Sequence, residues 1–193
     1  MIRVAVVDDH PALRAGLQTV LDSEPHIVFV GDSDGAEEHV WPMLNRVRPD
    51  VVLLDYHLPR GDGLQLCYRV KREVPAPRVI IFTAYASPTL ALPATLARAD
   101  GILAKGAGAR DLFSAIRLVY AGDQVLPPIS ATVLEEALED LLGDDRAIVG
   151  MLLDGASEGD IGQTLRLPHR DVRYAVQRIL SALRLDVPAA RAE

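Results

Sequence analysis

The run Val51-Val52-Leu53-Leu54-Asp55 decides the fold of this 193-residue chain. Four consecutive apolar residues without polar alternation predict a strand that is buried on both faces of a parallel sheet. The segment 56–63 that follows is rich in Pro and Gly and predicts a turn. Asp55 therefore falls at the carboxyl end of a strand, where open α/β sheets place their chemistry. The competing interpretation is that Asp55 only caps the turn.

Similar apolar runs recur along the first 122 residues, at 2–7, 27–30, 79–82 and 101–105. Segments with the apolar period of a helix lie between and after them, at 12–21, 36–47, 64–73, 88–99 and 110–120. This alternation predicts an α/β domain with a doubly wound, five-stranded parallel sheet. Pro93 interrupts the fourth helical segment. Since proline has no backbone donor, we expect that helix to begin near Pro93 and residues 86–92 to be irregular.

Polar side chains follow or end four of the five predicted strands. Because the carboxyl ends of parallel strands open onto one rim, we expect these side chains to meet there. Three clustered carboxylates repel one another and need a cation, and a set of oxygen ligands favours Mg²⁺. One carboxylate can then attack a phosphoryl group, whose oxygens a Lys and a Thr would stabilise. The residues concerned are Asp8, Asp9, Asp55, Thr83 and Lys105.

Together these residues resemble a two-component receiver domain, which has a flavodoxin-like fold. Asp8-Asp9, Asp55 with x-x-Leu-Pro-x-x-Asp-Gly behind it, Thr83-Ala84 and Lys105 match in order and spacing over residues 1–122. The resemblance implies that Asp55 accepts a phosphoryl group from a cognate histidine kinase. It also implies that Mg²⁺ is held by Asp8, Asp9, Asp55 and the backbone carbonyl of His57. Lys105 would pair with the phosphoryl group, Thr83 would report its arrival, and the small Ala84 would let it enter.

Three further positions bear on how such a receiver would switch. The family usually has Tyr or Phe at the position of Ile102, where the ring turns inward on activation, and Ile cannot make that hydrogen-bonded switch. His57 and Tyr85 occupy the two positions that flank the path of the attacking water in receivers. They either slow the loss of the phosphoryl group or are ordinary solvated loop side chains.

The net charge of −7 is unevenly placed, because residues 123–145 carry seven acidic and no basic side chains. This predicts an acidic linker over 123–143 with an amphipathic helix at 132–142. The acidic face of that helix is either solvated or a docking surface for a partner. The single cysteine, Cys67, cannot form an internal disulfide, and no apolar run reaches the length of a membrane span. We expect a cytoplasmic protein without membrane association.

From residue 144 to 186 the pattern is helical throughout. Ser157 and Asp160 match a capping box, residues 166–168 predict a turn, and residues 169–183 predict a longer helix. Two helices joined by a tight turn form a helix-turn-helix. The polar face of the second helix suits DNA, although the same face also fits ordinary solvation. It carries Arg170, Arg173, Tyr174, Gln177 and Arg178.

Residues 149–185 resemble the LuxR/NarL-type helix-turn-helix. With the receiver, this implies a transcriptional response regulator that binds double-stranded DNA, with base-edge contacts from Arg173, Tyr174 and Gln177 and backbone contacts from Arg170 and Arg178. Ala147 and Pro168 depart from the family pattern. Because residues 146–193 are near neutral and backbone electrostatics supply most non-specific DNA affinity, we expect a homodimer on a symmetric site. Residues 187–193 are predicted to be a disordered tail.

Two other classes of protein compete with this interpretation. A haloacid-dehalogenase-type phosphatase also sets an Asp nucleophile, Thr, Lys and acidic Mg²⁺ ligands at strand ends. It needs a second acid two residues after the nucleophile, where this chain has His57, so we expect no enzyme. The other class is an orphan regulator that a ligand or partner controls without phosphorylation. The intact acidic cluster argues against this class, whereas Ile102 and Pro93 argue for it.

Overall fold

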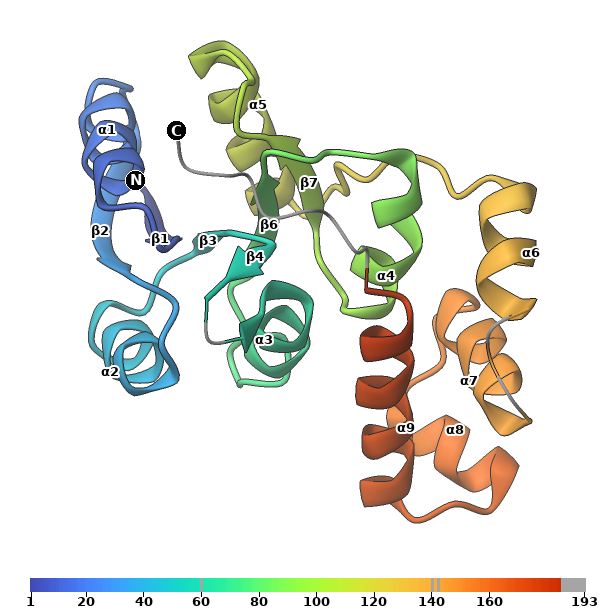
Figure 1. Cartoon of the computed structure of the whole chain (residues 1–193). Coiled ribbons are helices and arrows are strands. Elements are labelled where there is room, and N and C mark those ends of the chain that lie inside the picture. The colour runs from blue at the N-terminus through green and yellow to red at the C-terminus, as the bar shows by residue number, and fades with distance from the viewer. Residues whose placement is uncertain (60, 140, 142, 185–193) are drawn as a thin grey trace. The chain divides into compact units, whose positions relative to one another are not determined.

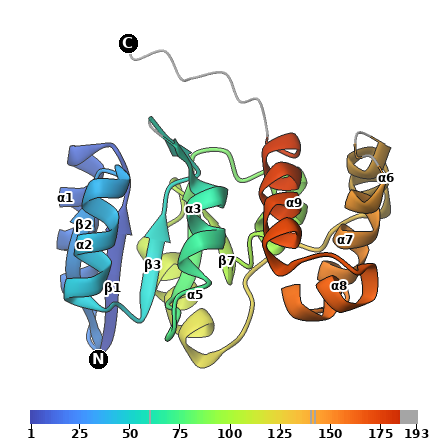
Figure 2. The ribbon, with the colours of Figure 1, turned by 90° about the horizontal axis from the view of Figure 1, so that it is seen from below.

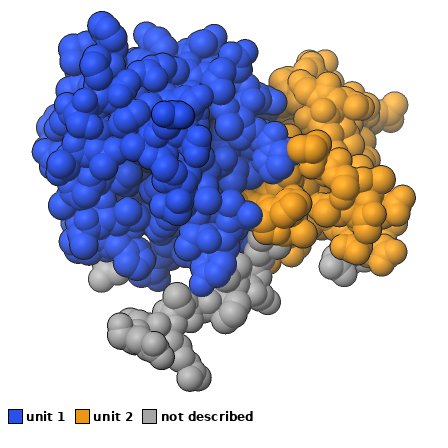
Figure 3. All heavy atoms as spheres, turned by 90° about the horizontal axis from the view of Figure 1, so that it is seen from above, with its two compact units in different colours: residues 1–86, 97–127 blue, residues 87–96, 128–193 orange. Residues whose placement is uncertain are grey.

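The computed structural model describes residues 1–59, 61–139, 141 and 143–184. The chain forms two compact units, residues 1–86 with 97–127 and residues 87–96 with 128–193 (Figure 3). The boundaries predicted at residues 122 and 143 stay predictions. The predicted tail at 187–193 and the last two residues of the predicted helix-turn-helix lie outside the described residues.

The first unit is built on the predicted five-stranded parallel sheet. Its strands are β1 (Ile2–Val7), β2 (Ile27–Ser33), β3 (Val51–Leu54), β6 (Arg78–Thr83) and β7 (Gly101–Ala104). They are ordered β2-β1-β3-β6-β7, and every pairing is parallel. The winding therefore reverses between β1 and β3, which creates a switch point at their carboxyl ends. All residues of β3 are buried, as its unbroken apolar run predicts.

Helices cover both faces of this sheet, so the doubly wound prediction is confirmed. Helices α1 (Pro11–Asp22) and α5 (Ala109–Ala121) lie on one side, and α2 (Glu37–Val47) and α3 (Gly63–Val70) on the other (Figure 1). From below, α2 and α3 lie in front of the strands (Figure 2). Apolar side chains of α1 and α5 pack with those of the strands in one buried core, and Leu21 and Ile116 are fully buried there.

A short hairpin after β3 was not predicted. Strands β4 (His57–Leu58) and β5 (Gly61–Asp62) pair antiparallel within the Pro/Gly-rich turn. Asp62 then caps α3, since its carboxylate accepts a 2.8 Å hydrogen bond from the backbone N–H of Leu64. A strand of two residues has no periodicity, so sequence patterns give no signal for it.

The second unit is helical and includes α4 (Ala91–Leu96) after a 3₁₀ turn, η1 (Pro88–Leu90). The prediction that residues 86–92 are irregular was wrong in part, because η1 covers Pro88–Leu90 and α4 begins at Ala91, two residues before Pro93. Pro93 is its third residue, in the first turn, where backbone N–H groups have no acceptor within the helix. Proline therefore costs little there. Within this unit, α4 packs against α7 (Asp144–Leu153) and α9 (His169–Ala182).

The remaining helices are α6 (Ala131–Glu139) and α8 (Glu158–Leu165). The predicted capping box at α8 is confirmed, because Ser157 and Asp160 each bond the backbone N–H of the other. A three-residue turn joins α8 to α9, and the predicted apolar face of α9 is buried. None of the helices in the described ranges is both long and apolar enough to span a membrane.

Candidate functional site

Two carboxylates are buried at the switch point of the sheet. Asp8 follows β1 and Asp55 follows β3, and their side chains are only 1% and 3% exposed. Backbone hydrogen bonds hold both in line with the sheet, from Asp8 N–H to the Ser33 carbonyl (3.0 Å) and from Asp55 N–H to the Val7 carbonyl (2.8 Å). The predicted rim cluster therefore forms because these two strands are neighbours.

Lys105 joins the two carboxylates from the end of β7. Its Nζ lies 2.7 Å from Asp8 Oδ2 and 2.8 Å from Asp55 Oδ2. Burial raises the pKa of Asp55, although Lys105 partly offsets this and the Asp8 charge adds to it. Burial lowers the pKa of Lys105, but its bonds to Asp55 and Asp8 outweigh burial and raise it. The raised pKa values of Asp55 and Lys105 both indicate that the cluster has too little positive charge. A bound cation would supply that charge.

Asp9 and His10 complete a set of ligand atoms. One atom each from Asp8, Asp9, His10 and Asp55 lies within 4.8 Å of the others. Asp9 Oδ1 is buried without a hydrogen bond, although His10 Nδ1 lies 2.6 Å away. A buried oxygen without a donor is costly unless something positive reaches it. The residues present therefore fit a divalent cation held mainly by oxygen.

Thr83 ends β6 at the same rim and is fully buried. Its Oγ1 accepts a 3.1 Å hydrogen bond from the backbone N–H of Tyr85, so the hydroxyl proton stays available to a phosphoryl oxygen. Ala84 beside it is exposed. Ile102 lies within β7, buried and paired with Ile81, and its side chain has no hydrogen-bonding group.

His57 follows Asp55 by two residues and forms one side of the rim. Its backbone N–H donates to Asp55 Oδ1 at 3.3 Å. Its ring meets the ring of Tyr85 edge to face at 5.7 Å between centroids. The two side chains that were expected to flank the path of water therefore pack against each other. The metal contact from the His57 carbonyl stays a prediction.

Gly63 keeps the turn close to Asp55. A Cβ at this position would clash with the backbone oxygen of Asp55 and with the backbone of Tyr56. The backbone N–H of Gly63 donates to the Tyr56 carbonyl at 3.1 Å. The Gly of the Asp-Gly pair that the sequence places here is thus required by the packing of the turn.

Two site residues were missed by sequence reasoning. His10 reaches both Asp8 and Asp9, and its adjacency to the acidic pair was the available signal. Arg14 of α1 donates to the Asp8 carbonyl and to Asp32, each at 2.6 Å. The position of Arg14, one helical turn after His10 in the sequence, does not by itself predict these hydrogen bonds.

The second unit carries the predicted DNA-contacting residues on α9. Arg170, Tyr174 and Arg178 are exposed, whereas Arg173 and Gln177 are half-buried. Arg178 is also engaged within the unit, because its Nε and Nη2 lie 3.0 and 2.5 Å from the two oxygens of the buried Asp145 of α7. The sequence did not indicate this pair. The DNA contacts themselves stay predictions.

The chain is similar to known proteins over most of its length. The profile of the response regulator receiver domain family matches residues 4–117. The chain is 31% identical to the DNA-binding transcriptional activator DevR/DosR of Mycobacterium tuberculosis, over 96% of this chain and 90% of that protein. It is 30% identical to the response regulator UvrY of Escherichia coli, over 96% and 89%.

A solved structure shares both the fold and the sequence pattern. It is a two-component response regulator of the LuxR family from Aurantimonas sp., with a TM-score of 0.61 and 29% identity. The match covers 70% of this chain and 97% of that one. The likeness therefore extends past the predicted end of the receiver.

Proposed function

We propose that this chain is a DNA-binding transcriptional regulator controlled by phosphorylation of Asp55. The proposal starts from its family, because the chain belongs to the two-component response regulators of the LuxR/NarL type. The observation that carries the proposal is the contact of Lys105 Nζ with both buried carboxylates at the switch point of the sheet. A buried nucleophile beside a fixed ammonium suits phosphoryl transfer better than it suits the capping of a turn.

In the transfer, an oxygen of the Asp55 carboxylate attacks the phosphorus atom of the donor. A new O–P bond forms, and the bond from phosphorus to the phosphohistidine nitrogen of a kinase breaks. The kinase histidine, which carries a proton on its other ring nitrogen, keeps the electron pair of the broken bond and leaves as neutral imidazole, and Asp55 becomes an acyl phosphate. Lys105 then moves from the carboxylates to the phosphoryl oxygens, and Thr83 donates its hydroxyl proton to one of them.

Mg²⁺ is the cofactor that the donor set favours. Asp8, Asp9, Asp55 and the His57 carbonyl would hold it, and the bound ion would neutralise charge on the phosphoryl oxygens. Asp9 Oδ1, buried and without a hydrogen bond, supports this assignment. His10 Nδ1 lies close enough to Asp9 to restrict where that carboxylate can turn.

The output is DNA binding through α9. Arg173, Tyr174 and Gln177 would read base edges in the major groove, and Arg170 and Arg178 would contact phosphates. The near-neutral C-terminal segment limits the affinity of one copy, so two copies on two half-sites would act together. The partners are thus a histidine kinase, double-stranded DNA and a second copy of this chain.

A hydrolase at the same site is disfavoured by His57. A phosphatase of the haloacid-dehalogenase type needs a carboxylate at this position to protonate the leaving group, whereas here an imidazole packs against Tyr85. We therefore expect one stable transfer to Asp55 and no turnover.

The proposal is tested by titrating the full chain against DNA before and after treatment with acetyl phosphate and Mg²⁺. A duplex selected from a randomised library serves as the probe. We expect treated protein to bind more tightly, and Asp55→Asn protein to be insensitive to treatment. Equal tightening in Asp55→Asn would contradict control through Asp55.

A further inference from the structure

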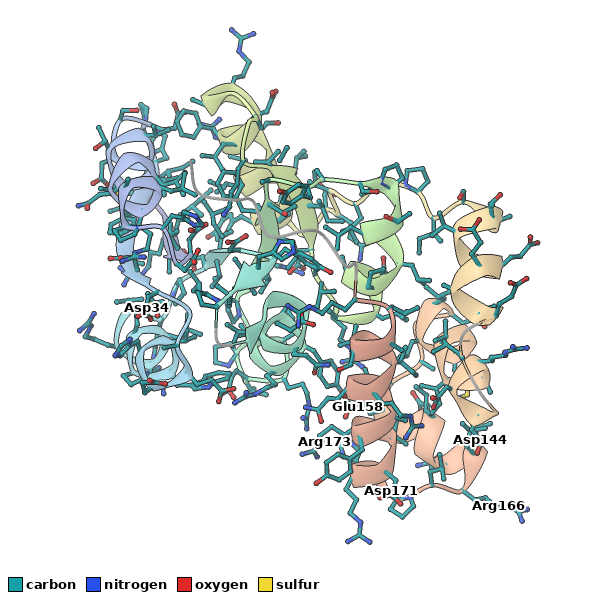
Figure 4. All side chains as sticks on the ribbon, in the orientation of Figure 1. Asp34, Asp144, Glu158, Arg166, Asp171 and Arg173 are labelled. Carbon is teal, nitrogen blue, oxygen red and sulfur yellow. The ribbon has the colours of Figure 1, made fainter. Side chains whose placement is uncertain are left out.

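His169, the first residue of α9, links a buried carboxylate to a predicted base-reading arginine. Its Nε2 lies 3.5 Å from Oε2 of Glu158, the first residue of α8, and the Glu158 side chain is only 7% exposed. Its Nδ1 lies 3.2 Å from Arg173 Nη2, one helical turn along α9. Figure 4 labels the two ends of this chain of contacts, Glu158 and Arg173.

The chemistry of the three groups fixes the direction of these contacts. A guanidinium only donates, so Nδ1 of His169 must be the acceptor for Arg173. When Nδ1 accepts from Arg173, the ring proton lies on Nε2, on the side of Glu158, whose Oε2 is 3.5 Å away. The negative charge of Glu158 therefore favours the tautomer that accepts from Arg173.

The inner part of the Arg173 guanidinium is buried. Its Nε has no hydrogen-bond partner and is buried, so this N–H is not exposed to a base, whereas Nη2 contacts His169. Nη2 carries two protons, and a bond to His169 uses one of them. The second proton, with those on Nη1, stays available as a fork for the acceptor edge of a base.

We infer that His169 is a positioning residue that sets the direction of the Arg173 guanidinium before DNA arrives. The inference rests on the proposed DNA-binding function. An arginine side chain whose orientation is fixed before binding loses less rotamer entropy when DNA binds. A fixed guanidinium also cannot reorient to form hydrogen bonds with a wrong base. His169 therefore acts on base discrimination rather than on the affinity shared by all sequences.

The test compares variants of the full chain on one selected duplex and on duplexes with single base changes. Arg173→Ala should lower discrimination at one position by about 5- to 100-fold. His169→Ala should lower it at the same position by about 3- to 10-fold, with an unchanged salt slope. His169→Asn keeps an acceptor near the place of Nδ1 and should stay within about twofold of the wild type.

The double variant His169→Ala/Arg173→Ala should discriminate no worse than Arg173→Ala alone. His39→Ala is the matched control, because His39 is similarly exposed (60% against 54%), pairs with a carboxylate and lies in the other unit. Additive losses in the double variant, or a His169→Ala defect equal on all sequences, would overturn the inference. If Arg173→Ala itself leaves discrimination unchanged, the assignment of Arg173 in the proposed function fails and the inference falls with it.

Discussion

At the residue scale, the acidic cluster depends on the Lys105 ammonium, which is the cation in contact with both Asp8 and Asp55. A bound metal ion and this ammonium occupy the same negative field, so each weakens the attraction for the other. The two cations nevertheless have different tasks, because only Lys105 can follow the phosphoryl group.

Lys105→Ala should therefore separate metal binding from phosphoryl transfer. We expect tighter Mg²⁺ binding by calorimetry, because a competing positive charge is gone, and a phosphorylation rate lowered by about tenfold or more. Lys105→Arg keeps the positive charge. Its Mg²⁺ affinity should return close to the wild-type value, whereas its phosphorylation rate should recover less. Weaker Mg²⁺ binding in Lys105→Ala would contradict this account of the cluster.

A second prediction concerns the lifetime of the phosphoryl group. The rings of His57 and Tyr85 meet edge to face, and we expect them to flank the path of a water that attacks the phosphoryl group on Asp55. Replacing both with Ala should speed the loss of label, measured as decay of the phosphorylated mass. Tyr120→Ala removes a tyrosine that is also exposed and should leave the decay unchanged. An unaltered decay in the double variant would show that these rings do not gate water.

The carboxylates and Lys105 could be predicted from the sequence because each follows an apolar strand, and topology alone brings strand ends together. Contacts made by side chains on different helices could not. His169 and Glu158 lie eleven positions apart, and their meeting depends on how the turn between α8 and α9 closes. The sequence gives no period for such a contact.

At the scale of the elements, the pair between Arg178 and Asp145 ties α9 to α7. Asp145 is buried, so removing its partner leaves a charge without compensation. Arg178→Ala should lower the free energy of unfolding of the C-terminal unit by about 1–2 kcal/mol, with the value reduced by the exposure of Arg178. Thermal denaturation of the full chain, monitored by a probe in that unit, measures the change.

The matched control is the double variant Asp145→Ala/Arg178→Ala, in which no charge is left alone. The double variant should be more stable than Arg178→Ala. Equal losses in the free energy of unfolding of the two variants would show that the unpaired charge of Asp145 is not the cause of the destabilisation. Because Arg178 forms this pair, its effect on DNA binding must be compared with that of Arg170, whose Nε lies 3.4 Å from the neighbouring Asp171.

Long, periodic elements were the ones that sequence patterns could predict. The five strands and the helix at 169–182 agree with their predicted ranges to within a few residues. The misses have physical causes, since the β4–β5 hairpin is too short to show a period, and Pro93 sits in a first turn where its missing donor has no effect.

At the scale of the whole molecule, the open question is how strongly phosphorylation controls output. Thr83 can follow the phosphoryl group, but Ile102 provides no ring to follow Thr83. The signal must then pass through residues 84–87, which form no helix or strand and where ordering the backbone costs about 1–2 kcal/mol per residue. Partial coupling follows from these two features.

We therefore expect phosphorylation to favour a homodimer while an appreciable active fraction exists without it. Solution mass measurement alongside DNA titration should show some dimer and some binding in untreated protein, with less than about a hundredfold gain on phosphorylation. Strict monomers that bind DNA only when phosphorylated would contradict partial coupling.

The central claim is that Asp55 accepts one phosphoryl group in a cation-dependent reaction, and intact-mass measurement after incubation with acetyl phosphate tests it most directly. We expect a single phosphoryl adduct with Mg²⁺, almost none with a chelator, a strongly reduced amount in Asp9→Asn, and none in Asp55→Asn. Asp62→Asn, which changes a nearby carboxylate that caps α3, should still be labelled. An adduct that persists in Asp55→Asn, or one that forms equally without a divalent cation, would contradict the claim.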